Sequence, residues 1–99
     1  MNKKEAIEIL NKLVKTLYET EEFCLEHEKD AEKYINEVNK LIPDNRFTRE
    51  VLLLLKTCSI AKGERREHLK IAIISDIENE IRKLKENIKE EEFKNIKEE

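Results

Sequence analysis

Four side chains of this sequence could act as soft metal ligands, two cysteines and two histidines. Cys24 and His27 are three residues apart, so on a helix both would project from one face. Cys58 and His68 lie five residues on either side of Gly63, and a helical hairpin turning there would set them roughly opposite each other. Two Cys and two His can form a closed tetrahedral zinc site. Structural zinc sites, however, commonly use short Cys-x-x-Cys loops, whereas this pattern places all four residues inside helices. We therefore favour buried thiols and surface histidines over a metal site, and expect no cofactor.

The familiar catalytic motifs are missing from the sequence. Neither histidine has a Glu three positions before it, which argues against the Glu-x-x-His pattern of di-iron bundles. The single Gly leaves no Gly-rich phosphate loop, and Ser59 and Ser75 stand in no nucleophile motif. Pairs of carboxylates are frequent, but on helices this charged they are expected to form a solvated face. We therefore predict that the protein is not an enzyme.

Charge is distributed unevenly along the chain. Residues 19–32 carry seven acids and one base, a local net charge of −6, and residues 46–70 carry seven bases and three acids, a net of +4. Within the basic segment, Lys62, Arg65 and Arg66 flank the single Gly, where a phosphate backbone could be contacted. The net charge of the whole chain is −3, which disfavours a general nucleic-acid or membrane-surface binder. We favour the alternative that the acidic and basic segments face each other, within one chain or across a dimer.

Composition predicts an all-α protein of one domain, residues 1–99. Ile, Leu, Val and Phe make up 29 of the 99 residues, enough for a folded core although 43% of the chain is charged. One Gly and one Pro leave few tight turns, which favours a few long helices over a β-architecture. The absence of Gln with abundant Lys and Glu favours a thermophilic archaeal or bacterial source.

The spacing of apolar residues predicts a small three- or four-helix bundle, with helices over residues 3–28, 30–42, 48–62 and 64–97. A single helix over residues 1–42 is the alternative for the first two, because no Gly or Pro interrupts that stretch. We place the break at 28–30 because Asp30 suits an N-cap. The turn at 43–45 begins with a Pro that cannot continue the second helix. Thr48 suits the cap of the third helix, and Gly63 suits a left-handed cap at its end.

The last helix carries the seam of a coiled coil, a 3-4-3-4 spacing of Ile74, Ile77, Ile81, Leu84 and Ile88. This helix should be about 50 Å long, whereas the two middle helices should each cover only about 20 Å. Part of the seam is therefore expected to need the first helix or a second copy of the chain. Phe93 and Ile96 fall out of phase with the seam, so the end of the helix is expected to fray or bend. We predict a homo-oligomer through the seam, most simply a dimer; a first helix that covers the seam alone would give a monomer.

Taken together, these patterns predict a non-catalytic helical protein–protein interaction module, such as a small subunit, adaptor or scaffold, that self-associates through its C-terminal helix. The alternative is a nucleic-acid-associated accessory protein that contacts phosphates through Lys62, Arg65 and Arg66, and a metal-stabilised bundle comes third. The longest apolar run, residues 51–55, is far shorter than the roughly 20 residues that span a bilayer, and the N-terminal residues lack an apolar signal core. We therefore expect a cytoplasmic protein with reduced cysteines and no membrane partner.

Overall fold

The computed structural model consists of four α-helices, in the order α1 (Lys3–Glu19), α2 (Leu25–Leu41), α3 (Arg46–Ile60) and α4 (Glu64–Glu98). The structure describes residues 3–20, 25–43 and 46–98, with the backbone alone for residues 25 and 94–98. No strand occurs among these residues, and none of their helices is both long enough and apolar enough to cross a membrane. The prediction of a small all-α bundle with a long C-terminal helix is confirmed, with four helices.

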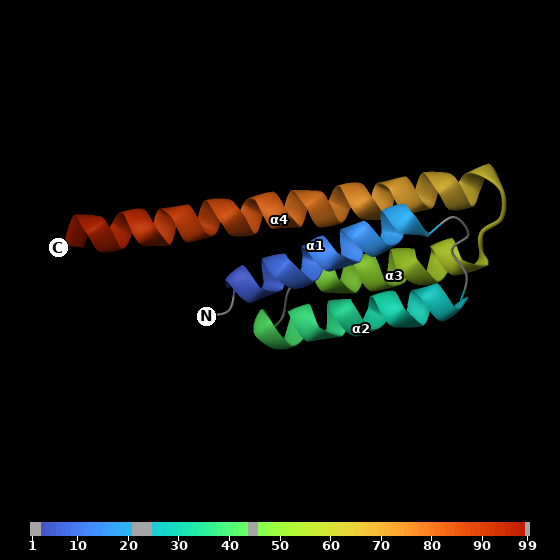
Figure 1. Ribbon diagram of the computed structural model, residues 1–99, viewed down its shortest axis with the longest axis horizontal. Coiled ribbons are helices and arrows are strands. Elements are labelled where there is room, and N and C mark those ends of the chain that lie inside the picture. Colours follow the sequence, from blue (N-terminus) through green and yellow to red (C-terminus); the bar gives the residue numbers. More distant parts are fainter. Residues whose placement is uncertain (1–2, 21–24, 44–45, 99) are drawn as a thin grey trace.

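Successive helices run in opposite directions along the long axis, so each is antiparallel to the next one in the sequence (Figure 1). Each also packs against its sequence neighbours, and α1 packs against α4 to close the bundle. The four helices differ in length: α4 has 35 residues, α1 and α2 have 17 each, and α3 has 15. The C-terminal part of α4 therefore extends beyond the other three helices and gives a molecule of 55 × 21 × 20 Å (Figure 1).

One hydrophobic core runs through the bundle, and each helix contributes a stripe of residues spaced three or four apart. In α1 the buried stripe is Ala6, Ile7, Leu10, Leu13 and Leu17. The shorter stripes are Ala31, Ile35 and Val38 in α2 and Val51, Leu55 and Cys58 in α3. This burial supplies the main stabilisation of helices whose outer faces are highly charged.

The predicted seam of α4 lies inside this core. Ile77 is fully buried, Ile74, Ile81 and Leu84 are 3–6% exposed, and Ile88 is partly buried. The reason is that α1 and α3 both pack along α4 within the same chain. α1 is thus one of the helices that cover these residues, as in the alternative of a seam covered by the first helix, and self-association through the seam stays a prediction.

The break between the first two helices was predicted in the wrong place. α1 ends at Glu19 and α2 begins at Leu25, so Asp30 lies inside α2 instead of at its N-cap. α1 ends near the end of the bundle at which α4 begins, and α2 returns from there along the bundle (Figure 1). Continuing α1 to residue 28 would lengthen it by about 13 Å. The side chain of Lys70 on α4 marks this end, because its ammonium group donates to the carbonyl of Thr20.

The start of α3 also differs from the prediction. α3 begins at Arg46, so Thr48 lies in its first turn and is not its cap. Thr48 is buried, and its hydroxyl donates to Asn39 Oδ1 at 3.2 Å, which ties α3 to α2. Of the predicted 43–45 turn, Pro43 forms a turn after α2, while residues 44 and 45 lie outside the described residues.

Gly63 adopts the predicted left-handed conformation, with φ of 63°. α3 ends at Ile60, two residues earlier than predicted, so Gly63 does not follow the helix directly. Its carbonyl accepts the N–H groups of Arg66 and Glu67, at 3.1 and 3.4 Å, and so begins α4. A side chain at this φ would be strained even though the surrounding space is open.

Candidate functional site

The candidate metal ligands are dispersed over three helices. His27 on α2 is half-buried, His68 on α4 is exposed, and Cys24 lies outside the described residues. Cys58 is fully buried on α3, where its thiol donates to the carbonyl of Arg66 at 3.6 Å, and burial raises its pKa. Within the described parts of the chain, no three His, Cys, Asp or Glu side chains are grouped so that they could hold a metal ion.

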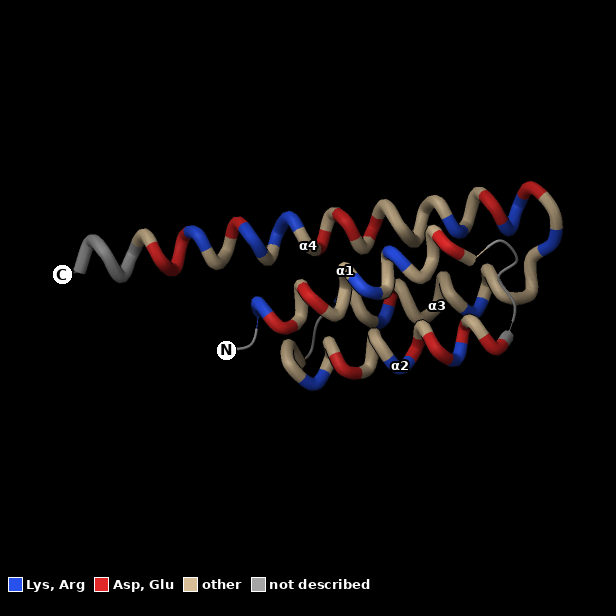
Figure 2. The backbone as a smooth tube through the Cα atoms, in the orientation of Figure 1, with Lys and Arg blue, Asp and Glu red and all other residues tan. Residues whose placement is uncertain are grey.

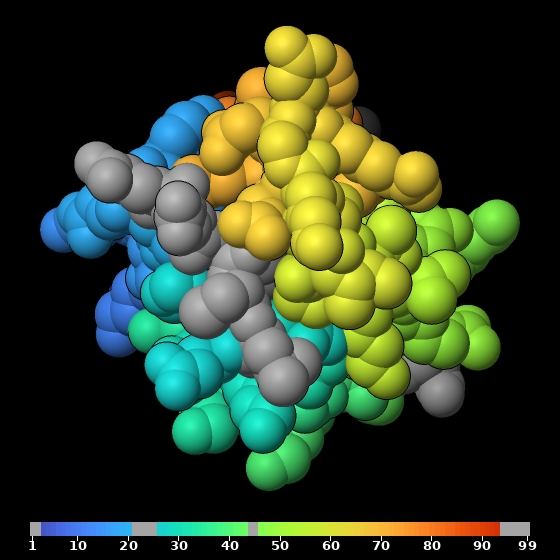
Figure 3. Space-filling view, turned by 90° about the vertical axis from the view of Figure 1, so that its right-hand side faces the viewer, coloured from blue at the N-terminus to red at the C-terminus, as the bar shows by residue number. Residues whose placement is uncertain are grey.

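The three residues of the predicted basic corner differ in their surroundings. The corner lies where α3 meets α4 at one end of the bundle (Figure 3). Lys62 and Arg65 are exposed there. Arg66 is half-buried, and its Nε donates to the carbonyl of Ala61 at 2.9 Å, just after the end of α3. Arg66 therefore stabilises the turn, and only Lys62 and Arg65 present their charge outward.

Acidic residues of α2 face polar and basic residues of α3, as favoured from the charge distribution. Glu28 is 5% exposed, and its Oε2 accepts a hydrogen bond from the Ser59 hydroxyl at 3.3 Å. Burial raises the pKa of Glu32. A hydrogen bond with Glu28 and the negative charge of Glu28 raise it further, and the positive charge of the nearby Lys56 lowers it. The acidic and basic segments thus meet within a single chain, between two adjacent helices.

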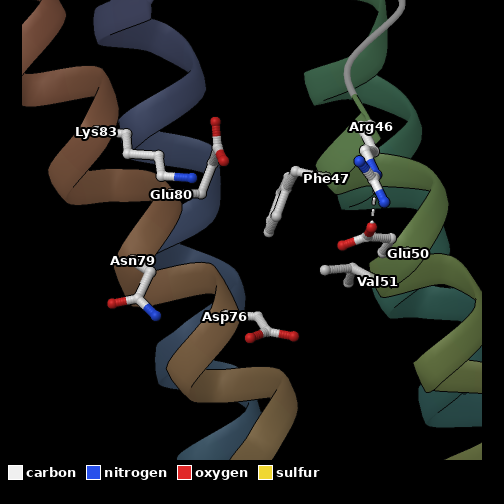
Figure 4. A pocket seen from close by; sticks show the side chains of 8 residues that line it. All are labelled: Arg46, Phe47, Glu50, Val51, Asp76, Asn79, Glu80 and Lys83. Carbon is white, nitrogen blue, oxygen red and sulfur yellow. Dashed lines mark hydrogen bonds and ion pairs between the residues drawn. The ribbon is translucent and has the colours of Figure 1, made fainter.

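An open groove of about 380 Å³ lies between the first turns of α3 and the middle of α4 (Figure 4). Its lining combines acids, bases and two apolar side chains: Arg46, Phe47, Glu50, Val51, Asp76, Asn79, Glu80 and Lys83. The Phe47 ring points into the space between the two helices, and Arg46 is paired with Glu50 at 2.9 Å (Figure 4). No His, Cys or Ser is among the residues that line this groove, and its ionisable side chains are acids and bases of α3 and α4.

A second hollow, the α1–α4 pocket, is more apolar and lies between the end of α1 and the first half of α4. It measures about 200 Å³ and is lined by Tyr18, Ile71, Ile74, Ser75, Glu78 and Arg82. Tyr18 and Ile71 are 65% and 61% exposed, although both carry large apolar surfaces. The Tyr18 hydroxyl donates to Glu78 Oε1 at 3.1 Å, which holds the ring against α4 as one wall of the pocket.

The same flank of α4 continues to Phe93, which is 59% exposed. Ile71 and Phe93 are 22 residues apart, which brings them to the same side of the helix within about 40° at 3.6 residues per turn. Lys3 and Lys4 of α1 form ion pairs with Glu91 and Glu92, at 2.5 and 3.7 Å. These pairs tie the start of α1 to the beginning of the α4 extension, and charges of both signs alternate along the helix (Figure 2).

Sequence reasoning singled out Phe93 only because it falls out of phase with the seam, and it did not identify Tyr18 or Ile71. The phase difference was the useful signal, since a large apolar residue outside the buried stripe of a helix points away from the core. Tyr18 and Ile71 lie in one pocket because of how far α1 runs along α4. The spacing of residues within a single helix does not predict that distance.

The chain matches no protein-family model, and no curated protein or solved structure shows significant similarity to it.

Proposed function

We propose that this protein is a non-catalytic helical interaction module, a small subunit or scaffold, that self-associates through the outer flank of α4. The observation that supports this most is the exposure of Tyr18, Ile71 and Phe93 along that flank. Tyr18 and Ile71 line one pocket, and Phe93 lies about 33 Å further along the same side of α4. Exposed apolar patches commonly mark a contact with another protein. The proposal keeps the C-terminal helix as the interface, but moves the contact from the seam to the exposed residues beside it.

The size of this surface suits a weak or moderate dimer. Complete burial of one large apolar side chain is worth about 1.5–3 kcal/mol, and these three are already partly covered. Association costs at least about 4 kcal/mol in lost freedom of motion, which one side chain cannot supply. Three side chains from each of two copies can exceed that cost. We expect a dimer that forms at micromolar concentrations.

Light scattering coupled to size-exclusion chromatography tests this proposal directly. The wild-type protein is expected to show a mass above that of the 11.9 kDa monomer, rising with concentration. A wild type that stays at the monomer mass up to about 100 µM, well above the expected dissociation constant, would contradict self-association.

The second candidate function is contact with nucleic acid, supported by the outward charges of Lys62 and Arg65 at the α3–α4 corner. Two cations beside a helix start can contact phosphates without reading sequence. Such binding would be weak and strongly dependent on salt concentration.

A further inference from the structure

The outer flank of α4 is complementary to itself. Towards its N-terminal end it contributes Ile71 and Ile74 to the α1–α4 pocket, and towards its C-terminal end it presents Phe93. The 22 residues from Ile71 to Phe93 span about 33 Å of helix. A two-fold axis perpendicular to α4 at Arg82 would place residue 71 of each helix opposite residue 93 of the other. Both contacts would therefore form at the same time in a closed dimer.

We propose that two copies of the chain pair in antiparallel orientation along α4, with the Phe93 ring of each copy seated in the α1–α4 pocket of the other. This inference rests on the proposed function and specifies its partner, a second copy, and its contact. The pocket of about 200 Å³ has room for an aromatic ring, and two isoleucines and a tyrosine form its apolar walls. The hydrogen bond from Tyr18 to Glu78 fixes one wall before a partner arrives, which reduces the cost of ordering it.

Charges along the flank favour the antiparallel direction over the parallel one. In a parallel two-fold pair, Glu78, Lys85 and Lys89 would each lie opposite the same residue of the second copy, and like charges repel. With the axis at Arg82, Glu78 is level with the partner's Glu86, which points to the other side of the contact, and within one residue of the partner's Lys85, which points to the same side. Ser75 is level with the partner's Lys89. Arg82 lies opposite its own copy on the axis, but its guanidinium donates to Asn79 of the same chain. The partner's Glu78 is one turn from it.

The arrangement also accounts for the length of α4. In an antiparallel dimer the α4 extension of each copy lies beside the partner's pocket, where it covers Tyr18 and Ile71. Three of the five large apolar side chains that the described residues expose, Tyr18, Ile71 and Phe93, are then covered in one interface. The other two, Leu53 and Ile60, lie on α3 outside it and provide matched controls.

Substitutions at the two ends of the flank test the contact in the full chain. Phe93→Ser and Ile71→Glu are each expected to raise the dimer dissociation constant at least about tenfold in sedimentation equilibrium, because by symmetry each changes the apolar contact at both ends of the interface. Leu53→Ser removes an equally exposed side chain from α3 and is expected to leave the constant unchanged. All three variants should keep the wild-type circular dichroism spectrum, since the residues are exposed. Below the dissociation constant, where every protein is monomeric, they should also keep the wild-type melting temperature. If the dissociation constant is unchanged in both Phe93→Ser and Ile71→Glu, the pocket contact is overturned while the proposed self-association stands. A wild type that is monomeric would overturn both.

Crosslinking tests the direction. Cys24→Ser and Cys58→Ala remove the native thiols, with Cys58→Val as the replacement if the melting temperature falls. Ser75→Cys is then introduced into one preparation and Lys89→Cys into a second preparation, whose chain has a distinguishable mass. A short bismaleimide is expected to crosslink the mixture into a heterodimer but not Ser75→Cys alone, because the axis would separate its two copies by about 21 Å along the helix. Crosslinking of Ser75→Cys to itself without the mixed product would indicate parallel pairing and overturn the proposal.

Discussion

The hydroxyl of Tyr18 donates a hydrogen bond to Glu78 Oε1, 3.1 Å away, and so connects α1 to α4 on the flank where Ile71 is exposed. The bond and the negative charge of Glu78 raise the pKa of Tyr18 above its usual value of 10.0, since a phenol can donate only while it is protonated. The same bond holds the ring as a wall of the α1–α4 pocket.

A specific pH dependence follows from the raised pKa of Tyr18. The folded state holds this proton more tightly than the unfolded state, so the contribution to stability is present below pH 10.0 and is lost as pH rises through the raised pKa. In an ultraviolet titration we expect a tyrosine signal above the usual value, and we expect Glu78→Gln to lower it because the charge is removed. Tyr18→Phe is the control. A late-titrating signal that persists in Tyr18→Phe would contradict this assignment.

Burial of the seam within one chain predicts a large difference between two isoleucines of α4. Ile77 is fully buried, so Ile77→Ala is expected to lower the free energy of unfolding by about 2–5 kcal/mol. Ile71 is 61% exposed, so Ile71→Ala is expected to cost no more than about 0.5 kcal/mol in the same urea titration. Equal costs at the two positions would contradict the packing of the seam against α1 and α3.

The four helices could be predicted from sequence because each buries a stripe with a 3-4 spacing, as Leu10, Leu13 and Leu17 do in α1. Pro43 and Gly63 mark two of the three connections by their own backbone chemistry. The connection after α1 has neither residue among the described positions, so nothing local fixed it, and Asp30 was wrongly chosen as a cap.

The candidate site was less predictable because it depends on packing between distant segments. A seam buried in its own bundle and a seam buried in a dimer have the same spacing, so Ile77 and Ile81 could not be assigned from sequence to either. Likewise, the bond from Arg66 to Ala61 requires the geometry of the Gly63 turn. Sequence alone therefore grouped Arg66 with Lys62 and Arg65.

The contact of Arg66 with the end of α3 predicts unequal effects for two neighbouring arginines. Arg66 Nε donates to the Ala61 carbonyl at 2.9 Å, a group left without a helical partner at this end. We expect Arg66→Ala to lower the free energy of unfolding by about 1–2 kcal/mol. Arg65→Ala, at an exposed position, should change it by no more than about 0.5 kcal/mol. Chemical denaturation measures both, and equal losses would contradict a structural role for Arg66.

Nucleic-acid binding at the corner is therefore best tested at Lys62 and Arg65 alone. If the corner contacts phosphates, a Lys62→Glu/Arg65→Glu double variant should be retained less on DNA or RNA, with a flatter dependence on salt. Its melting temperature should match that of the wild type, since both residues are exposed. Equal retention of the two proteins would exclude the corner as a binding site. Reversing Arg66 as well would confuse lost binding with lost stability.

The last prediction concerns Glu32, which lies one turn after the buried Glu28 on α2. Burial raises the pKa of Glu32 above its usual 4.5, and the hydrogen bond with Glu28 and the negative charge of Glu28 raise it further. The positive charges of Lys56 and Lys29 lower it. The folded state therefore holds the proton more tightly than the unfolded state. The resulting stability is fully present below pH 4.5 and is lost as pH rises through the raised pKa.

Glu32→Gln cannot ionise, so we expect it to be more stable than the wild type towards urea at neutral pH. That advantage should shrink as the pH falls below 4.5, where the wild-type carboxyl is also neutral. Glu37→Gln, at an exposed position of the same helix, is the matched control. A Glu32→Gln variant that is less stable at neutral pH would mean that attraction to Lys56 outweighs the burial and repulsion at this pair.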